Sequence, residues 1–308
     1  MAVDPSYMQY GKRRPGMDHD LYPVSYLPDR KPVSWPDGKH VAVWIVPILE
    51  FFPLDMKAEP INPPGGMTRP YPDYWNYTLD DYGNRVGIYR ILEALQARGM
   101  KATTAFNARL ADHYPQLMRD CVEAGSEIVA HGWDMGTIHG DYLPEEQEKE
   151  IIKRTRGRIG EVSGAEPEGW LAPAMALSRN TTRLVAEAGF RYTCDWVNDE
   201  LPFAMTGDAA PLVAMPLGYE LSDLRLMLEY RQMAWEYGEQ VTDALKFLVK
   251  EARDNKAGRV LALPLHPWLA GAPHRIGAVE QILDQVANEP GCWVATGAEI
   301  LNAWETQQ

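Results

Sequence analysis

A chain of 308 residues with 45% hydrophobic side chains can bury a large core, and we expect one catalytic domain. Its 43 acidic residues outnumber 30 basic ones, and the net charge of -13 disfavours nucleic acid and acidic membrane surfaces as partners. The three cysteines are widely separated and odd in number, which favours reduced thiols in a cytoplasm. The N-terminus lacks the apolar region of a signal peptide, and the longest apolar run, residues 41–49, is too short to span a bilayer. We therefore expect a cytoplasmic protein without membrane partners.

The first third of the chain contains two irregular segments around one clear strand. Residues 1–37 are rich in proline, tyrosine and charged side chains without periodicity, which predicts an N-terminal arm before a domain at 38–308. The apolar run at 41–49 predicts a strand that ends at Glu50. Residues 51–82 carry six prolines and no regular period, which predicts an irregular lid, a subunit contact or an ordered loop over a barrel end.

From residue 86 onward, strands and helices alternate. Helices are predicted over 86–99, 108–124, 144–162, 178–188, 241–255 and 276–288, with a short closing helix. Strands are predicted over 101–106, 127–130, 169–171, 190–194, 212–216, 260–265 and 293–296. This order, without an internal repeat, predicts an α/β fold with a (β/α) barrel rather than an open sheet. No glycine-rich phosphate loop is present, so we expect no dinucleotide cofactor.

Four of the apolar runs end in a group that can move a proton. Glu50, His131, Asp195 and His266 each follow a predicted strand directly. In parallel β/α architectures the carboxyl ends of the strands are where catalytic side chains collect. One such histidine is more often structural, but two of them together with Glu50 indicate an enzyme.

These residues occur in an order that is typical of a known family. With Glu50, His131-Gly132-Trp133, Gly169-Trp170-Leu171-Ala172-Pro173, Asp195-Trp196 and Leu265-His266-Pro267, the sequence resembles the polysaccharide deacetylase superfamily, or NodB-homology fold, over about residues 38–300. The resemblance implies a distorted (β/α)7 barrel. Residues 32–38, 198–203 and 266–275 are similar to the allantoinase and cyclic-imidase-like branch, whose members hydrolyse small amides.

Departures from the family pattern affect the metal site. Metal-dependent members carry two adjacent aspartates after the first strand and two histidines four apart after the third. Here Glu50-Phe51 replaces the aspartates, and Met135 replaces the second histidine. The resemblance therefore implies no tightly held metal and no other cofactor, because zinc needs at least three protein ligands. The alternative is a zinc or manganese site made by His131 and His266 with His139 or Asp134.

Amide hydrolysis requires a base for water, a donor for the oxyanion and an acid for the departing nitrogen. The resemblance places Glu50 as the base or as the group that orients water. His131 and His266 are then predicted to stabilise the oxyanion and protonate the leaving group, in either order. Asp195 is predicted to fix the tautomer of an imidazole, although a buried ion pair fits its position equally well.

Five further residues are predicted to bind substrate. Trp133, Trp170 and Trp268 follow the strand-end groups and could form apolar walls that stack on a planar substrate. Glu200 lies in the Asp-Glu-Leu-Pro segment of the branch, and Arg275 could pair with a substrate carboxylate. The ordinary alternatives are core packing for the tryptophans, a turn cap for Glu200 and a surface or subunit ion pair for Arg275.

The leading hypothesis is a hydrolase of a small amide, cyclic imide or ureide that acts without a firmly bound metal. The alternatives are a metal-dependent deacetylase of an N-acetylated compound, a non-hydrolytic enzyme and a binding protein on the same barrel. The expected partners are a small-molecule substrate and further copies of the chain, because the arm and residues 51–82 are suited to subunit contacts.

Overall fold

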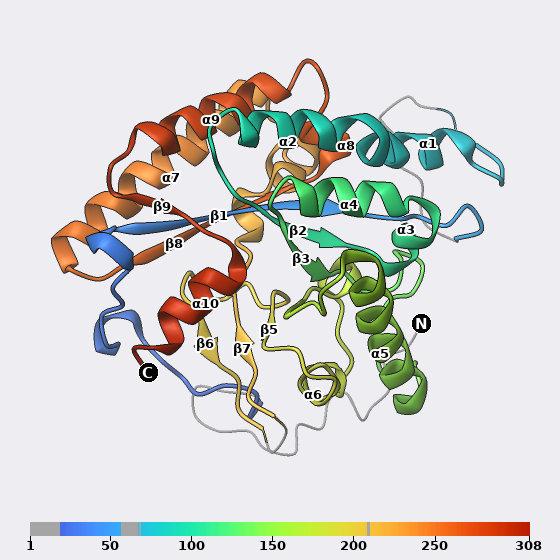
Figure 1. Cartoon of the computed structure of the whole chain (residues 1–308), viewed down its shortest axis with the longest axis horizontal. Coiled ribbons are helices and arrows are strands. Elements are labelled where there is room, and N and C mark those ends of the chain that lie inside the picture. Colours follow the sequence, from blue (N-terminus) through green and yellow to red (C-terminus); the bar gives the residue numbers. More distant parts are fainter. Residues whose placement is uncertain (1–18, 57–66, 68, 208–209) are drawn as a thin grey trace.

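The computed structural model describes residues 19–56, 67, 69–207 and 210–308 as one α/β domain (Figure 1). Within this part of the chain nine strands form one sheet in the order β6-β7-β5-β4-β3-β2-β1-β8, and β9 pairs with β1. The strands are β1 Val41–Leu49, β2 Thr103–Phe106, β3 Glu127–Ala130, β4 Gly169–Trp170, β5 Tyr192–Thr193, β6 Phe203–Ala204, β7 Val213–Ala214, β8 Arg259–Leu265 and β9 Cys292–Val294.

The sheet is parallel except between β6 and β7, so the carboxyl ends of its parallel strands share one edge. Every residue of strand β1 is buried, and this strand pairs with β2, β9 and, from Val41 to Pro47, β8. Burial on both faces explains why this run is continuously apolar.

Helices cover the sheet from outside. They are α1 Tyr74–Tyr82, α2 Ile88–Gln96, α3 Ala108–His113, α4 Pro115–Glu123, α5 Glu145–Ser163, α6 Thr181–Glu187, α7 Ala234–Asn255, α8 Pro267–Ala270, α9 Ile276–Asn288 and α10 Gly297–Glu305. Shorter helical turns are η2 Leu27–Asp29, η3 Pro36–Gly38, η4 Gly83–Gly87, η5 Pro173–Met175, η6 Tyr219–Leu221 and η7 Leu224–Glu229.

The two faces of β1 belong to different parts of the core. Val41, Val43 and Ile45 pack with α2, α7 and α9 outside the sheet (Figure 1). Trp44 and Val46 face the interior, where the Trp44 indole donates to Thr103 Oγ1 at 2.9 Å. Alternate residues of a strand point to opposite faces, so β1 joins the interior to the outer helical layer.

The predicted distorted barrel is confirmed, as a half-barrel that is open between β6 and β8. Three helix predictions need correction. The helix expected over 108–124 is divided at Tyr114, because Pro115 begins a second helix, and α7 begins seven residues earlier than expected, at Ala234. The segment 51–82, predicted to be irregular, contains α1, which Asp73 caps by accepting the Asn76 N–H at 3.1 Å.

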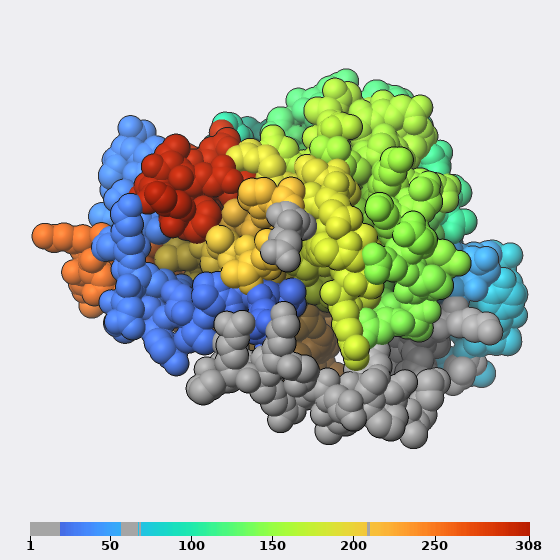
Figure 2. Space-filling model, turned by 90° about the horizontal axis from the view of Figure 1, so that it is seen from below, coloured from blue at the N-terminus to red at the C-terminus, as the bar shows by residue number. Residues whose placement is uncertain are grey.

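The described part of the N-terminal arm lies against the domain, as Figure 2 shows for the blue segment. Trp35 is buried and donates to the Arg259 carbonyl at 2.8 Å, while Arg30 forms an ion pair with Asp199 at 2.7 Å. The rest of the arm, residues 1–18, and residues 57–66 and 68 of the predicted lid lie outside the described residues. Among the helices of the described part, none is long and apolar enough to cross a membrane.

Candidate active site

A cavity of about 390 Å³ opens at the carboxyl ends of the parallel strands. Three of the four predicted catalytic residues, Glu50, His131 and His266, line it at the ends of β1, β3 and β8. The remaining lining residues are Ile48, Leu171, Ala172, Ala174, Met175, Val197, Tyr219, Ser222, Leu224 and Pro264. Segments that lie more than 200 residues apart in the chain therefore meet at one site.

Asparagine side chains hold the backbone of the site in place. Asn107, at the end of β2, accepts the Phe51 N–H at 2.7 Å and donates to the carbonyl of His131. Asn84 donates to the carbonyl of Glu50 at 2.9 Å. Both residues are buried, so these hydrogen bonds fix the ends of β1 and β3 relative to each other.

The imidazole of His131 has a defined orientation. Its Nδ1 lies 3.1 Å from the carbonyl oxygen of Leu171, which can only accept, so Nδ1 carries a hydrogen. Its Nε2 is buried without a hydrogen-bond partner and lies 3.7 Å from Glu50 Oε1. In the neutral ring the free electron pair is therefore on Nε2, beside the carboxylate.

His266 is held by Asp223, a residue that the sequence analysis did not select. Asp223 Oδ1 lies 2.7 Å from His266 Nδ1, and Oδ2 accepts the His266 backbone N–H at 2.7 Å. Burial alone would lower the pKa of His266, but the charge and hydrogen bond of Asp223, together with Glu50 and Asp80, raise it to about 9. At neutral pH His266 is an imidazolium whose Nε2–H is left for another group.

Glu50 carries the opposite charge. Burial raises the pKa of a carboxyl group, but contact with His131, the charge of His266 and the Trp268 indole outweigh it, so the pKa of Glu50 lies below its usual value. Asp80 on α1 is a second nearby carboxyl group, and burial followed by the charge of Glu50 raises its pKa to about 7. The cavity thus contains one carboxylate and one imidazolium at neutral pH.

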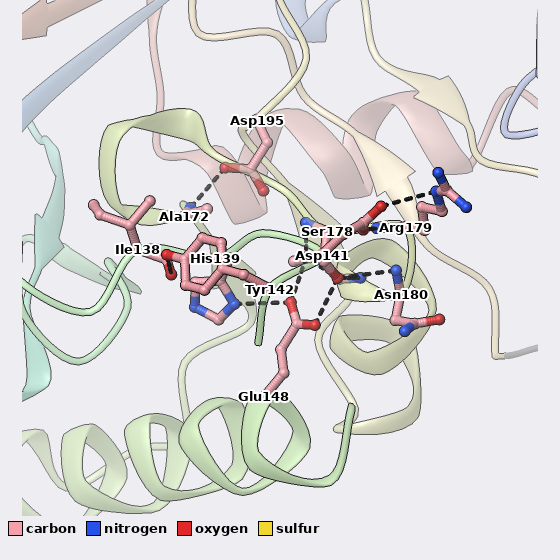
Figure 3. Close-up of polar contacts among 11 residues, drawn as sticks. Ile138, His139, Asp141, Tyr142, Glu148, Ala172, Ser178, Arg179, Asn180 and Asp195 are labelled. Carbon is pink, nitrogen blue, oxygen red and sulfur yellow. Dashed lines mark hydrogen bonds and ion pairs between the residues drawn. The ribbon is translucent and has the colours of Figure 1, made fainter. Parts of the chain in front are cut away.

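Asp195 does not have the predicted role. Its Oδ1 accepts the Ala172 N–H (Figure 3) and its Oδ2 accepts the Thr193 hydroxyl, both at 2.6 Å, and it hydrogen-bonds neither histidine of the cavity. One backbone N–H and one side-chain hydroxyl occupy the two oxygens of this carboxyl group, and Asp223 is the residue that contacts a cavity imidazole. Burial raises the pKa of Asp195 to about 6.

The three tryptophans do not line the cavity. Trp170 is fully buried against His139 and Phe190, since it lies within β4 and points to the outer core. The Arg154 guanidinium carbon lies over the Trp133 ring, 3.5 Å from the centroid of that ring. Trp268 packs against the α7 and α9 core, with its indole nitrogen near enough to Glu50 to lower the pKa of that carboxyl group.

The two charged candidates also lie elsewhere. Glu200 is exposed and lines a neighbouring cavity of about 280 Å³ with Asp199. Arg275 precedes α9 and is half-buried, outside the cavity lining. The strand-end pattern thus selected three residues that line one cavity, Glu50, His131 and His266, whereas nearness in sequence was a poor guide to the cavity walls.

The alternative metal ligands are not brought to His131 and His266. His139 Nδ1 lies 2.9 Å from Glu148 in a buried network with Ser178 (Figure 3). Asp134 forms an ion pair with Arg109 at 2.8 Å. In the described ranges no three histidine, cysteine or carboxylate side chains are grouped to hold a metal ion. His131 Nε2 and Glu50 provide two donors, and the donor set does not fit a three-ligand zinc or manganese site.

Comparison with known proteins gives consistent similarities. A family model described as polysaccharide deacetylase matches residues 69–193. A putative polysaccharide deacetylase of Schizosaccharomyces pombe is 25% identical over 74% of this chain and 75% of its own length. A peptidoglycan deacetylase of Helicobacter pylori is 22% identical over 71% of this chain and 84% of its own length.

Solved structures share the fold. A probable polysaccharide deacetylase of Pseudomonas aeruginosa PAO1 superposes with a TM-score of 0.79 at 24% identity, covering 89% of this chain and 94% of that one. The PuuE allantoinase structure also has a TM-score of 0.79 at 24% identity, covering 92% and 99%. A putative polysaccharide deacetylase from Mycobacterium smegmatis has a TM-score of 0.74 at 25% identity, covering 93% and 96%.

Proposed function

Because the chain belongs to the polysaccharide deacetylase superfamily, we propose that it hydrolyses non-peptide carbon–nitrogen bonds, and that its substrate is a small amide, cyclic imide or ureide. One observation carries the proposal. Glu50, ionised at neutral pH, and His266, kept charged by Asp223, line the same cavity. A base and an acid with opposite charges at one carbonyl are what amide hydrolysis requires.

The base side of the reaction is assigned to Glu50 and His131. A water molecule in the cavity can donate one hydrogen to the Glu50 carboxylate and the other to His131 Nε2, since both are acceptors and lie 3.7 Å apart. Glu50 takes the proton as the water oxygen attacks the carbonyl carbon. His131 orients the water, because its own orientation is fixed by the Leu171 carbonyl.

The acid side is assigned to His266. Its Nδ1–H is committed to Asp223, so its Nε2–H can donate to the carbonyl oxygen as negative charge develops there. The proton that Glu50 has accepted then passes to the nitrogen, the carbon–nitrogen bond breaks, and the carboxyl product and the amine or ureido group leave. All of these steps use side chains of the chain itself.

The size of the cavity supports a small substrate. Its volume of about 390 Å³ is at the lower end of the range of small-molecule sites. A five- or six-membered ring with one substituent fits such a space. A ureide is included among the candidates because an allantoinase has the same fold.

A substrate panel tests the proposal. Purified protein is incubated with cyclic imides, hydantoins, allantoin and N-acetylated sugars, and ring opening or acetate release is followed by mass spectrometry. We expect ring opening, and we expect His266→Asn to lose it while His274→Asn, an exposed histidine eight residues later, keeps it. Acetate release that depends on added zinc would instead support the metal-dependent deacetylase, and equal activity of both variants would refute the role of His266.

A further inference from the structure

We propose that the cavity selects an uncharged substrate with a hydrocarbon substituent, such as an alkyl-substituted hydantoin or cyclic imide. This inference rests on the proposed function and adds the chemical nature of the group beside the reacting bond. The reaction is addition of water across the ring carbon–nitrogen bond, which gives a carboxylic acid and an open-chain amide or ureido group.

Apart from the three reactive residues, the lining is almost entirely apolar. It comes from four regions that converge on the strand ends: β1 with β8, the loop after β4, the loop after β5 and the segment around η6 and η7. Their apolar contributions are Ile48, Leu171, Ala172, Ala174, Met175, Val197, Leu224 and Pro264. A polar substituent in this space loses its hydrogen bonds to water and regains few of them, whereas a hydrocarbon group gains from burial.

The two remaining polar residues already make hydrogen bonds within the protein. The Tyr219 hydroxyl donates to Glu229, and Ser222 Oγ accepts the Arg225 N–H at 3.0 Å. Tyr219 therefore has no donor left, and the Ser222 hydroxyl, which keeps its own O–H, is the remaining side-chain donor of these two residues. The lining therefore offers few hydrogen bonds to a polar substituent.

The charges of the cavity argue against an anionic substrate. Among the described residues that line it there is no arginine or lysine, and Arg275 lies outside. The imidazolium of His266 is already matched by Asp223, and Glu50 adds a negative charge. A substrate carboxylate or phosphate would lose its hydration and meet a carboxylate without a free cation.

One part of the wall has an unusual backbone. Ala174 and Met175 are consecutive residues with positive φ, 55° and 51°, although neither is glycine, and both line the cavity. Asp195 anchors this loop at its start through the Ala172 N–H. Strained non-glycine residues tend to occur where the chain positions a functional group, and here they place a methyl and a thioether side chain on the cavity wall.

The experiment compares two hydantoins that differ only in the polarity of one substituent. 5-Isobutylhydantoin and allantoin carry branched groups of similar size on the same ring carbon, one hydrocarbon and one ureido. We expect kcat/KM to be at least about tenfold higher for 5-isobutylhydantoin, because hydrophobic pockets discriminate by this order for small groups. Equal values, or a preference for allantoin, would overturn the selectivity proposed here and leave the hydrolase function intact.

Substitutions in the cavity lining test whether these side chains cause the preference for a hydrocarbon substituent. Met175→Gln and Val197→Thr each add polarity at nearly constant size, and Val197 is 53% exposed, so its replacement does not disturb the core. We expect both to lower the ratio of kcat/KM for 5-isobutylhydantoin over allantoin. The matched control is Val122→Thr on α4, which is 37% exposed and lies outside the cavity, and it should leave the ratio unchanged.

Calorimetry separates failure of this inference from failure of the proposed function. If neither hydantoin is hydrolysed, the proposed function fails, and the affinities of the two compounds decide the inference alone. Tighter binding of 5-isobutylhydantoin, reduced by Met175→Gln, would still support an apolar site. Equal affinity, or no binding of either compound, would overturn it.

Discussion

Asp223 accepts two hydrogen bonds from one residue, His266: the ring Nδ1–H and the backbone N–H, both at 2.7 Å. The carboxylate is fully buried and precedes His266 by 43 residues in the sequence. It therefore sets both the position and the charge of the imidazole that faces Glu50.

The first prediction concerns Asp223→Asn. The amide retains size but removes the charge that raises the pKa of His266 to about 9, so this pKa should fall. We expect kcat/KM at pH 8 to drop by about 100- to 10,000-fold, the usual contribution of general acid catalysis. The alkaline limb of the pH profile should move to lower pH. An unchanged alkaline limb would show that Asp223 does not control His266.

The Asp223–His266 pair also makes the stability of the fold depend on pH. Because the pKa of His266 is higher in the folded state, about 9, than its ordinary value of 6.5, the pair stabilises the fold fully below pH 6.5. This contribution is lost as the pH rises through 9. Urea titrations at pH 6 and pH 9.5 should therefore show a larger difference between wild type and Asp223→Asn at pH 6.

The second prediction concerns the base. Glu50→Gln keeps the size of the side chain but cannot accept a proton from water, so kcat should fall by about 100- to 10,000-fold. Circular dichroism should show an unchanged fold. Glu200→Gln is the control, since Glu200 is exposed and lines a different cavity, and it should retain wild-type kcat. A larger loss of kcat in Glu200→Gln than in Glu50→Gln would contradict the assignment of Glu50 as the base.

The third prediction separates two histidines of one loop. His131→Asn should abolish most turnover with little loss of stability, because its Nε2 contacts no protein hydrogen-bond partner. His139→Asn should do the opposite and destabilise the fold by about 3 kcal/mol, because it breaks a buried pair with Glu148. Thermal melting together with kcat at 20 °C measures both. Loss of turnover in a folded His139→Asn protein would indicate that His139 serves the site directly.

The fourth prediction concerns Asp195, whose pKa of about 6 exceeds its ordinary value of 3.8. The folded state binds the proton more tightly, so the contribution of this residue to the free energy of unfolding decreases as the pH rises from 3.8 to 6. Asp195→Asn keeps the size and can retain the hydrogen bonds to Ala172 and Thr193. Relative to wild type, the variant should gain stability between pH 4 and pH 7. A loss of stability relative to wild type would show that the buried charge of Asp195 stabilises the fold.

Much of the fold followed from the sequence because its strands are long or sharply bounded. The apolar run of β1 and the glycines after several helices predicted the alternation. Helix α1 was missed because prolines dominate the segment before it, although Asp73 followed by Asn76 is a capping signal. The opening of the barrel depends on the antiparallel pairing of β6, and two-residue strands carry no periodicity.

The meeting of Glu50, His131 and His266 in one cavity could be predicted because each one follows a strand, and parallel strands bring their ends together. Asp223 could not, since it lies in an irregular segment and its partner is distant in sequence. The tryptophans were misplaced for a related reason. Trp170 is adjacent to Leu171, yet the alternation of side chains turns it to the outer core while Leu171 lines the cavity.

Acid–base catalysis by Glu50 and His266 is tested most directly by hydrolysis of a cyclic imide with protein that has been dialysed against a chelator. We predict that turnover survives dialysis. The pH dependence of kcat/KM should be bell-shaped, with an acid limb from Glu50 below pH 4.5 and an alkaline limb near pH 9 from His266. Loss of turnover on dialysis, with recovery on addition of zinc or manganese, would contradict the account.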